Sequence, residues 1–331
     1  MPICVILAAG EGTRMNSRKP KVLSEILFYP MLGWVLDSVN AYGIRNVCVV
    51  TGYRHEMVSK FIKKEKYNCR TVIQDNRKGT AHAVMTASNF IKQHMGEDIL
   101  VLNGDSPFID SKTIMNAYDI HKLGSYATIV SAKLDSPTGY GRIIRNKLGS
   151  ICAIIEEKDA DLDQKRIKEI NSGIYWFKSE SLLDLLSQIK ESESGEFYLT
   201  SVISILIENN KKVSVYLTDD PSSVLGANNP EQLKILNQIA NEKIIEKFKS
   251  KGVYIPYENN VLIGKNVQIG EGTTILSDVT ILEDAKIGKD CVIGPGTNIL
   301  GGKIPDNTNL IFHDDLSSRD DFYKEKKCFA V

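Results

Sequence analysis

Isoleucine recurs every six residues between Ile263 and Ile299. Most of these isoleucines are followed four places later by a small or β-branched residue, such as Thr273 or Ala285. A hexad repeat of this kind predicts a parallel β-helix in which three hexads make one triangular coil. The repeat stops near Ile304, so we expect about two and a half coils. A solenoid this short exposes its ends and one flank, and we therefore expect a partner chain to cover it.

The first hundred residues alternate between short apolar runs and segments with helical spacing. This alternation predicts a parallel sheet with right-handed crossovers, in which ligands bind beyond the carboxyl ends of the strands. The Gly10 loop, the Gln74 loop and Asp105 all follow predicted strands. We expect strands at residues 3–7, 47–50, 71–73 and 98–102, and helices at residues 31–42, 55–66 and 80–94.

The next stretch is less regular. We expect strands at residues 127–134, 143–145, 151–155, 170–177 and 213–217, and helices at residues 182–189 and 198–207. Pro230 then opens a long charged helix that ends at Gly252 and links this part to the hexad repeat. The predicted organisation is a first domain over 1–229, a connecting helix over 230–252, a β-helix over 253–305 and a polar tail over 306–331.

The composition argues against several classes of function. Acidic and basic residues balance at 41 each in 331 residues, so net charge gives no reason to expect binding to nucleic acid or to a membrane surface. No apolar stretch approaches the roughly 20 residues that a membrane span requires. The six cysteines are scattered, and the N-terminus lacks the features of a signal peptide. We expect a cytoplasmic protein.

The opening stretch has the character of a phosphate site. An apolar run ends in small residues around Gly10 and Gly12, and the cations Arg14 and Lys21 follow. Small residues allow backbone N–H groups to approach an anion closely. A dinucleotide-binding fold is the alternative, but its fingerprint needs a third glycine, and Arg14 and Met15 stand there instead.

Several further motifs join this loop to a known family. The chain resembles the sugar-1-phosphate nucleotidyltransferases over residues 1–229, and most closely the bacterial N-acetylglucosamine-1-phosphate uridyltransferases. The motifs that carry the resemblance are residues 7–15, 19–23, Gln74 with 79–83, 104–107, 138–142, 155–160, 169–173, 195–200 and 226–229. The resemblance implies an α/β fold: a Rossmann-like nucleotidyltransferase domain with a mixed, mostly parallel sheet, followed by a short left-handed β-helix.

The resemblance also implies a nucleotide site. Backbone groups of Leu7, Ala8, Ala9 and Gly10 would hold the uracil and ribose of UTP together with Gln74, Gly79 and Thr80. An amide side chain offers one acceptor and two donors, which suits the mixed edge of uracil. Arg14 and Lys21 would be catalytic residues that grip the triphosphate and neutralise charge on the transferred phosphoryl group.

Further residues are implied for the metal and the sugar. Asp105 and Asn228 would hold Mg²⁺ through hard oxygen ligands. Gly141, Glu156 and Asn171 would bind the amino-sugar. If these two residues have no binding role, Asp105 would be a turn residue that resembles a helix N-cap, and Glu156 would be a solvated residue at the end of a strand.

The implied reaction is direct transfer from UTP to N-acetylglucosamine-1-phosphate, giving UDP-N-acetylglucosamine and pyrophosphate. The sugar phosphate is already an anion, so no covalent enzyme intermediate is needed, and the histidines are not expected to be catalytic. Two alternatives stay open: a pyrophosphorylase for another sugar or nucleotide, and a non-catalytic scaffold relative.

The sequence departs from the family pattern in two places. Position 11 is glutamate, where the most similar relatives usually carry a cation. The bifunctional members also carry a longer β-helix with an acetyltransferase site, and the corresponding segment is missing here, so we expect no acetyltransferase activity. Related β-helices form trimers, and we expect a homotrimer.

Overall fold

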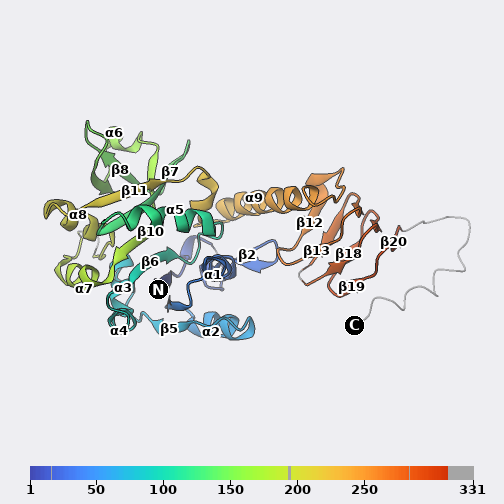
Figure 1. Ribbon diagram of the computed structural model, residues 1–331, viewed down its shortest axis with the longest axis horizontal. Coiled ribbons are helices and arrows are strands. Elements are labelled where there is room, and N and C mark those ends of the chain that lie inside the picture. Colours follow the sequence, from blue (N-terminus) through green and yellow to red (C-terminus); the bar gives the residue numbers. More distant parts are fainter. Residues whose placement is uncertain (16, 193–194, 283, 312–331) are drawn as a thin grey trace, which may run out of the picture. The chain divides into compact units, whose positions relative to one another are not determined.

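The computed structural model describes residues 1–15, 17–192, 195–282 and 284–311 (Figure 1). The chain divides into two compact units, Met1–Ile239 and Ala240–Val331. The long helix α9, Pro230–Lys249, runs across this division. Most of the predicted polar tail lies outside the described residues.

The first unit is built on a sheet that has nine strands among the described residues. Seven of them follow the order β11-β7-β10-β6-β1-β4-β5, and the hairpin β8–β9 joins through β10. Neighbouring strands β1, β6 and β10 come from distant parts of the sequence, as their colours in Figure 1 show. The strands are β1 Ile3–Ala8, β4 Asn46–Thr51, β5 Arg70–Ile73, β6 Asp98–Asn103, β7 Ala127–Lys133, β8 Gly141–Arg145, β9 Ile151–Ile155, β10 Glu169–Lys178 and β11 Val213–Leu217.

The sheet is mixed because β10 runs against its neighbours. Strands β6, β1, β4 and β5 are parallel, as are β11 and β7, whereas β10 is antiparallel to β6, β7 and β8. The prediction of a mixed, mostly parallel sheet is therefore confirmed. A separate two-stranded ribbon pairs β2, Glu25–Ile26, with β3, Tyr29–Pro30.

Both faces of the central strands β1, β4 and β6 are buried. Along β1, Ile3 and Val5 pack into one hydrophobic cluster, and Cys4 and Ile6 pack into another on the opposite face. Helices α3, α4, α7 and α8 contribute to the first cluster, and α1, α2 and α5 to the second. Burial on two sides explains why the strands are continuous apolar runs instead of alternating ones.

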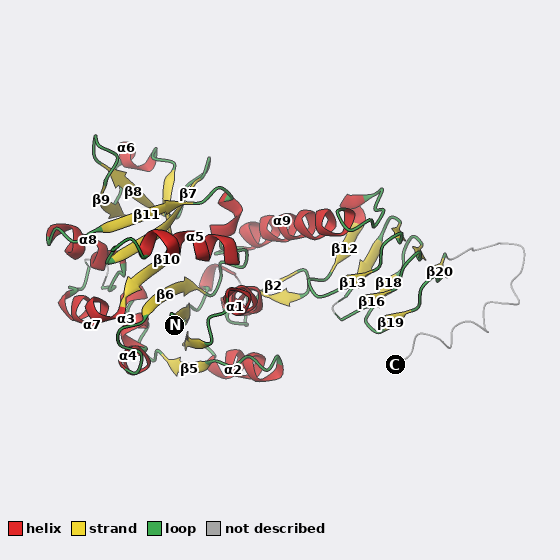
Figure 2. Cartoon of the chain, viewed as in Figure 1, coloured by secondary structure: helices red, strands yellow, loops and turns green. Residues whose placement is uncertain are grey.

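Figure 2 shows the helices of the first unit, in red, around the strands of the sheet. Their bounds are α1 Met31–Tyr42, α2 His55–Lys64, α3 Thr80–Thr86, α4 Ser88–Lys92, α5 Ser111–His121, α6 Leu162–Lys165, α7 Ser179–Gln188 and α8 Thr200–Glu208. No helix of the described chain combines the length and the apolar character needed to cross a bilayer.

The helix predicted over residues 80–94 is wrong as a single element. It breaks at Ala87 into α3 and α4. The hydroxyls of Thr86 and Ser88 donate to the backbone oxygens of His82 and Met85, and such bonds compete with the regular helical pattern.

The hexad repeat forms parallel coils. The described residues contain three sheets of three strands, with the orders β12-β15-β18, β13-β16-β19 and β14-β17-β20. The strands are β12 Val261–Ile263, β13 Gln268–Ile269, β14 Thr274–Ile275, β15 Val279–Ile281, β16 Lys286–Ile287, β17 Val292–Ile293, β18 Asn298–Ile299, β19 Lys303–Ile304 and β20 Asn309–Leu310. The predicted β-helix is confirmed.

The number of coils and the end of the repeat differ from the prediction. Strand β20 lies beyond residue 305 and pairs with β17, so the described strands complete three coils. Ile287 pairs with Ile304, and this last coil is one residue shorter than the one before it, where Ile269 pairs with Ile287. The shorter spacing breaks the period of six, so the period does not predict the last strands.

Candidate functional site

The carboxyl ends of β1, β4, β5 and β6 lie side by side, and the predicted site residues begin there. The Gly104 amide donates to the Leu7 oxygen at 2.9 Å, and the Tyr53 amide donates to the Ala9 oxygen at 3.3 Å. Ala8 and Ala9 are buried, whereas Gly10 is exposed, with open space where a Cβ would stand. The backbone that follows β1 is thus fixed by its neighbours and opens toward solvent at Gly10.

Three predicted residues meet in one cluster. The Lys21 ammonium donates to the Asn228 Oδ1 atom at 2.7 Å and forms an ion pair with the Asp105 carboxylate. The Lys21 and Asp105 side chains are only 15% and 16% exposed. Residues 21, 105 and 228 belong to three separate segments, so the fold alone brings them together.

Lys21 is packed closely against Gly12. Lys21 opens the short 3-10 helix η2, Lys21–Leu23, whose Val22 and Leu23 are buried. Gly12 has a φ of +68°, and a Cβ there would lie 2.6 Å from the Lys21 Cβ atom. A larger residue at Gly12 would therefore push Lys21 away, in addition to the cost of its left-handed backbone.

Tyr140 buttresses the Asp105 side of the cluster. Its hydroxyl accepts a hydrogen bond from the Gly226 amide at 3.3 Å. A Cβ at Gly226 would lie 3.0 Å from the Asp105 backbone oxygen. Burial raises the pKa of Tyr140, with a further contribution from the Asp105 charge, so the phenol stays neutral.

The oxygens of this cluster suit a divalent cation. The carboxylate of Asp105 and the Oδ1 atom of Asn228 both point at the same cationic group, the Lys21 ammonium. Magnesium prefers such oxygens and usually takes only one or two ligands from the protein, with waters and phosphates completing its shell. The described residues hold no group of three or more His, Cys, Asp or Glu suited to a metal. The donor set therefore fits magnesium held jointly with a phosphate substrate.

Arg14 is not held by this cluster in the described residues. It belongs to the short 3-10 helix η1, Thr13–Met15, and its side chain is exposed. No hydrogen bond or ion pair joins it to another residue in the described part of the chain.

Gln74 is held firmly at the end of β5. Its backbone N–H donates to the Thr51 oxygen at 2.7 Å, and the residue is 4% exposed. The Nε2 atom donates to the Gly79 oxygen at 3.2 Å and lies 2.8 Å from the Nδ1 atom of His82. His82 is a contact that sequence reasoning missed, although the Gly79–Ala83 motif contains it.

Gly79 and Thr80 pack against a distant segment. Gly79 has a φ of +97°, and a Cβ there would lie 2.5 Å from the Phe197 oxygen. The Phe197 amide donates to the Lys78 oxygen at 2.7 Å, and the Leu199 amide donates to the Thr80 hydroxyl at 3.0 Å. The Thr80 hydroxyl is thus engaged by the protein itself.

The three residues predicted for the sugar also come together. Gly141 and Asn171 are partners in the pairing of β8 with β10, and a Cβ at Gly141 would lie 3.4 Å from the Glu156 Oε2 atom. The Thr200 hydroxyl donates to the Glu156 Oε1 atom at 2.9 Å. Asn171 is buried, and its Nδ2 atom donates to the Tyr175 hydroxyl at 2.7 Å.

Glu156 is not a solvated strand end. Its side chain is partly buried, and burial raises the pKa of its carboxyl above the usual value for glutamate. A carboxylate in this state is desolvated and has unused acceptor capacity, which suits recognition of hydroxyl groups.

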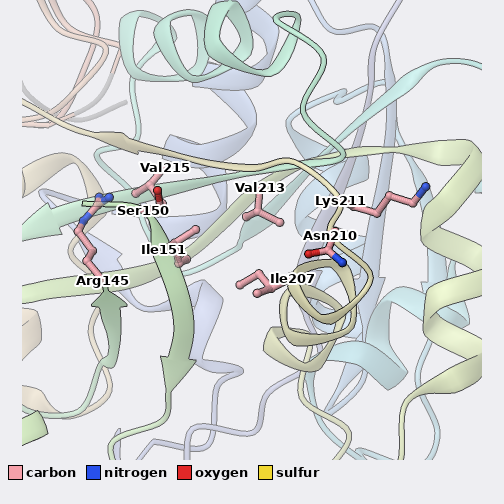
Figure 3. Close-up of a pocket in the computed structure, with 8 residues that line it drawn as sticks. All are labelled: Arg145, Ser150, Ile151, Ile207, Asn210, Lys211, Val213 and Val215. Atoms are coloured by element: carbon pink, nitrogen blue, oxygen red, sulfur yellow. The ribbon is translucent and has the colours of Figure 1, made fainter. Parts of the chain in front are cut away.

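A hollow lies elsewhere on the first unit (Figure 3). It has a volume of about 320 Å³ and contains none of the predicted site residues. Its lining consists of Arg145, Ser150, Ile151, Ile207, Asn210, Lys211, Val213 and Val215.

Comparisons with known proteins identify the family of the chain. The nucleotidyl transferase family profile matches residues 3–222. The chain belongs to the nucleotidyl transferase family. The profile of the bacterial transferase hexapeptide, with six repeats, matches residues 266–301. The predictions of a nucleotidyltransferase enzyme and of hexapeptide repeats are confirmed.

Curated relatives of this nucleotidyl transferase are named bifunctional protein GlmU. The protein from Acetivibrio thermocellus is 40% identical over 312 residues, which cover 93% of this chain and 66% of the relative. The protein from Carboxydothermus hydrogenoformans is 35% identical over 310 residues, covering 93% and 68%. The protein from Aquifex aeolicus is 39% identical over 269 residues, covering 78% and 57%. The chain spans about 57–68% of the length of these relatives.

A solved structure shares the fold. The glucose-1-phosphate thymidylyltransferase described from Bacillus anthracis, in complex with sucrose, superposes with a TM-score of 0.60 at 19% identity. The match covers 72% of this chain and 95% of the other.

The raised pKa of Glu156 predicts a stability effect with a definite sign. When the pKa of a carboxyl is higher in the folded protein than in the unfolded chain, the free energy of unfolding falls as pH rises from the lower pKa to the higher one. The Glu156→Gln variant should therefore match the wild type near pH 4 and become the more stable protein by pH 7.5. Thermal unfolding at both pH values measures this.

The neighbouring glutamate provides a contrast. Glu157 forms a 2.8 Å ion pair with Arg142, whose side chain is 1% exposed. Glu157→Gln should lower the thermal midpoint at pH 7.5, because it leaves a buried guanidinium without its counter-ion. A loss of stability in Glu156→Gln at pH 7.5 would contradict the assignment of Glu156 as a carboxylate that is destabilised by desolvation.

Proposed function

We propose that this protein transfers a uridylyl group from UTP to N-acetylglucosamine-1-phosphate, releasing pyrophosphate and UDP-N-acetylglucosamine. The observation that carries the proposal is the cluster of Lys21, Asp105 and Asn228 at the strand ends next to the Gly10 loop. A cation and two metal-suited oxygens beside a loop of small residues are the groups that phosphoryl transfer requires. The similarity to GlmU proteins supports the same reaction class.

The orientation of Gln74 supports uracil as the base. The Gly79 oxygen can only accept, so it faces the Nε2 atom and not Oε1. The second hydrogen of Nε2 points to His82 Nδ1, which leaves Oε1 as the free polar atom; no donor to it lies among the described residues. Uracil presents a ring N3–H donor to such an acceptor, whereas the ring N3 of cytosine is itself an acceptor.

This orientation refines the expectation from the sequence. Sequence reasoning assigned both the donors and the acceptor of the Gln74 amide to uracil. In the folded chain the donors serve Gly79 and His82. Selection of the base by Gln74 then depends on a single acceptor, the Oε1 atom. Backbone groups near Leu7–Gly10 would bind the rest of the base edge.

In the reaction, a phosphate oxygen of the sugar-1-phosphate attacks the α-phosphorus of UTP, and the bond from that phosphorus to the pyrophosphate oxygen breaks. Lys21 turns from Asp105 and Asn228 to the phosphoryl oxygens and neutralises their growing charge, and Arg14 binds the triphosphate from the loop. Asp105 and Asn228 would hold magnesium, which supplies further charge neutralisation when bound.

Acceptor binding is assigned to Gly141, Glu156 and Asn171. Gly141 leaves room for the sugar ring, and Glu156 and Asn171 offer acceptors and donors for its hydroxyl and acetamido groups. For the second unit we infer a homotrimer, because hexapeptide repeats favour that assembly.

Substrate choice is tested by a grid of nucleoside triphosphates against sugar-1-phosphates, with pyrophosphate release measured with and without Mg²⁺. We expect the highest kcat/KM for UTP with N-acetylglucosamine-1-phosphate in the presence of Mg²⁺. TTP also carries an N3–H donor and is the most informative competitor. A clear preference for TTP, or for another sugar phosphate, would redirect the proposal within the same family.

Lys21→Ala should lower kcat by about 100- to 1000-fold, because it removes a positioned charge that acts on the transition state. Lys19→Ala is the matched control: Lys19 lies two residues away, is exposed and pairs with Glu25 at 3.2 Å. It should keep kcat near that of the wild type, and circular dichroism should show both variants folded. Turnover within tenfold of the wild type in Lys21→Ala would refute the assigned role.

His82 should control base selectivity through Gln74. His82→Phe removes the acceptor at Nδ1 and frees the amide to rotate, so the ratio of kcat/KM for UTP over CTP should fall by about tenfold. His82→Asn keeps an acceptor near the same place and should preserve most of the ratio. An unchanged ratio in His82→Phe would show that Gln74 needs no support from His82.

A further inference from the structure

Glu11 is an acidic residue in the loop assigned to the triphosphate. It follows Gly10 directly and precedes Gly12 and Arg14. A carboxylate at this place repels a triphosphate unless its charge is cancelled. The structure supplies a cation for it: the Arg77 Nη2 atom lies 3.0 Å from the Glu11 Oε2 atom.

The ion pair joins two loops across the end of a third strand. Glu11 follows β1 and Arg77 follows β5, and β4 lies between these strands in the sheet. Tyr53 follows β4, and the Arg77 guanidinium carbon lies 5.8 Å from the centre of its ring. The Arg77 side chain therefore reaches from the loop that carries Gln74, over the Tyr53 ring, to Glu11 in the loop that carries Gly10.

This ion pair contributes little to the stability of the fold. The side chains of Arg77 and Glu11 are 41% and 39% exposed, and exposed ion pairs contribute little to folding. Its effect is local: it neutralises a negative charge in the loop that is proposed to bind the triphosphate.

We propose that Arg77 is the counter-ion of Glu11 and keeps the Gly10–Arg14 loop able to accept a triphosphate. This inference rests on the proposed function. Arg77 acts through Glu11 as a positioning residue and does not contact the reacting atoms. Without Arg77, the free carboxylate weakens binding of UTP, and without both residues the repulsion is gone.

The test compares Arg77→Ala, Glu11→Gln and the double variant in the full-length protein, using the KM for UTP and calorimetric titration with UTP. Arg77→Ala should raise the KM for UTP about fivefold, with kcat within about twofold of the wild type. The double variant Glu11→Gln/Arg77→Ala should return to within about twofold of the wild-type KM. Arg77→Lys keeps the charge and should resemble the wild type.

Two controls separate this effect from general loss of charge. Arg166 forms a similar exposed ion pair with Asp163 at 3.0 Å, and Arg166→Ala should leave the KM for UTP unchanged. The effect of Arg77→Ala should also shrink at 0.5 M NaCl, because salt screens exposed charges.

Each outcome decides the inference. A KM for UTP in Arg77→Ala equal to that of the wild type overturns it. A double variant that stays as weak as Arg77→Ala also overturns it, because Arg77 would then bind the triphosphate directly. A wild-type protein that neither binds nor turns over UTP refutes the proposed function itself, and that result is distinct from an active wild type with an unaffected Arg77→Ala.

Discussion

Burial of the central sheet on both faces is the constraint from which the site follows. Residues of β1 alternate between two hydrophobic clusters, so neither face of this strand is available for polar chemistry. On this strand, functional groups can then lie only at its carboxyl end. Because β6, β1, β4 and β5 are parallel, their carboxyl ends meet at one edge, and the loops that carry Gly10, Gln74 and Asp105 converge there.

Charge at this edge is arranged in compensated pairs. Lys21 is held by Asp105 and Asn228, and Glu11 is held by Arg77. Under the proposed function, Lys21 would exchange its two partners for phosphoryl oxygens, whereas Arg77 would stay paired with Glu11. Such an exchange would limit the cost of desolvating the Lys21 ammonium when a highly charged triphosphate binds.

The hexapeptide unit follows a simpler rule. In each hexad the isoleucine and the small or β-branched residue four places later are buried, as Ile281 and Ala285 illustrate. Each side of the coil is one hexad with the same two inward positions, so the sequence period and the structural period coincide. The exception is the last coil, where one residue fewer carries the chain from Ile287 to Ile304.

The sequence by itself determined most of the strands and helices along the chain, the β-helix, and the motifs from which the site residues were predicted, because periodicity and short motifs are local properties. The break at Ala87 and the added strand β20 depend on hydrogen bonds and a shortened spacing that leave weak local signals. Only the tertiary structure decided which groups are partners. Lys21 meets Asn228 across 207 positions, and Gln74 is turned by Gly79 and His82 so that one oxygen stays free. Such contacts depend on distances between segments that are far apart in the chain, and these distances exist only after the sheet has formed.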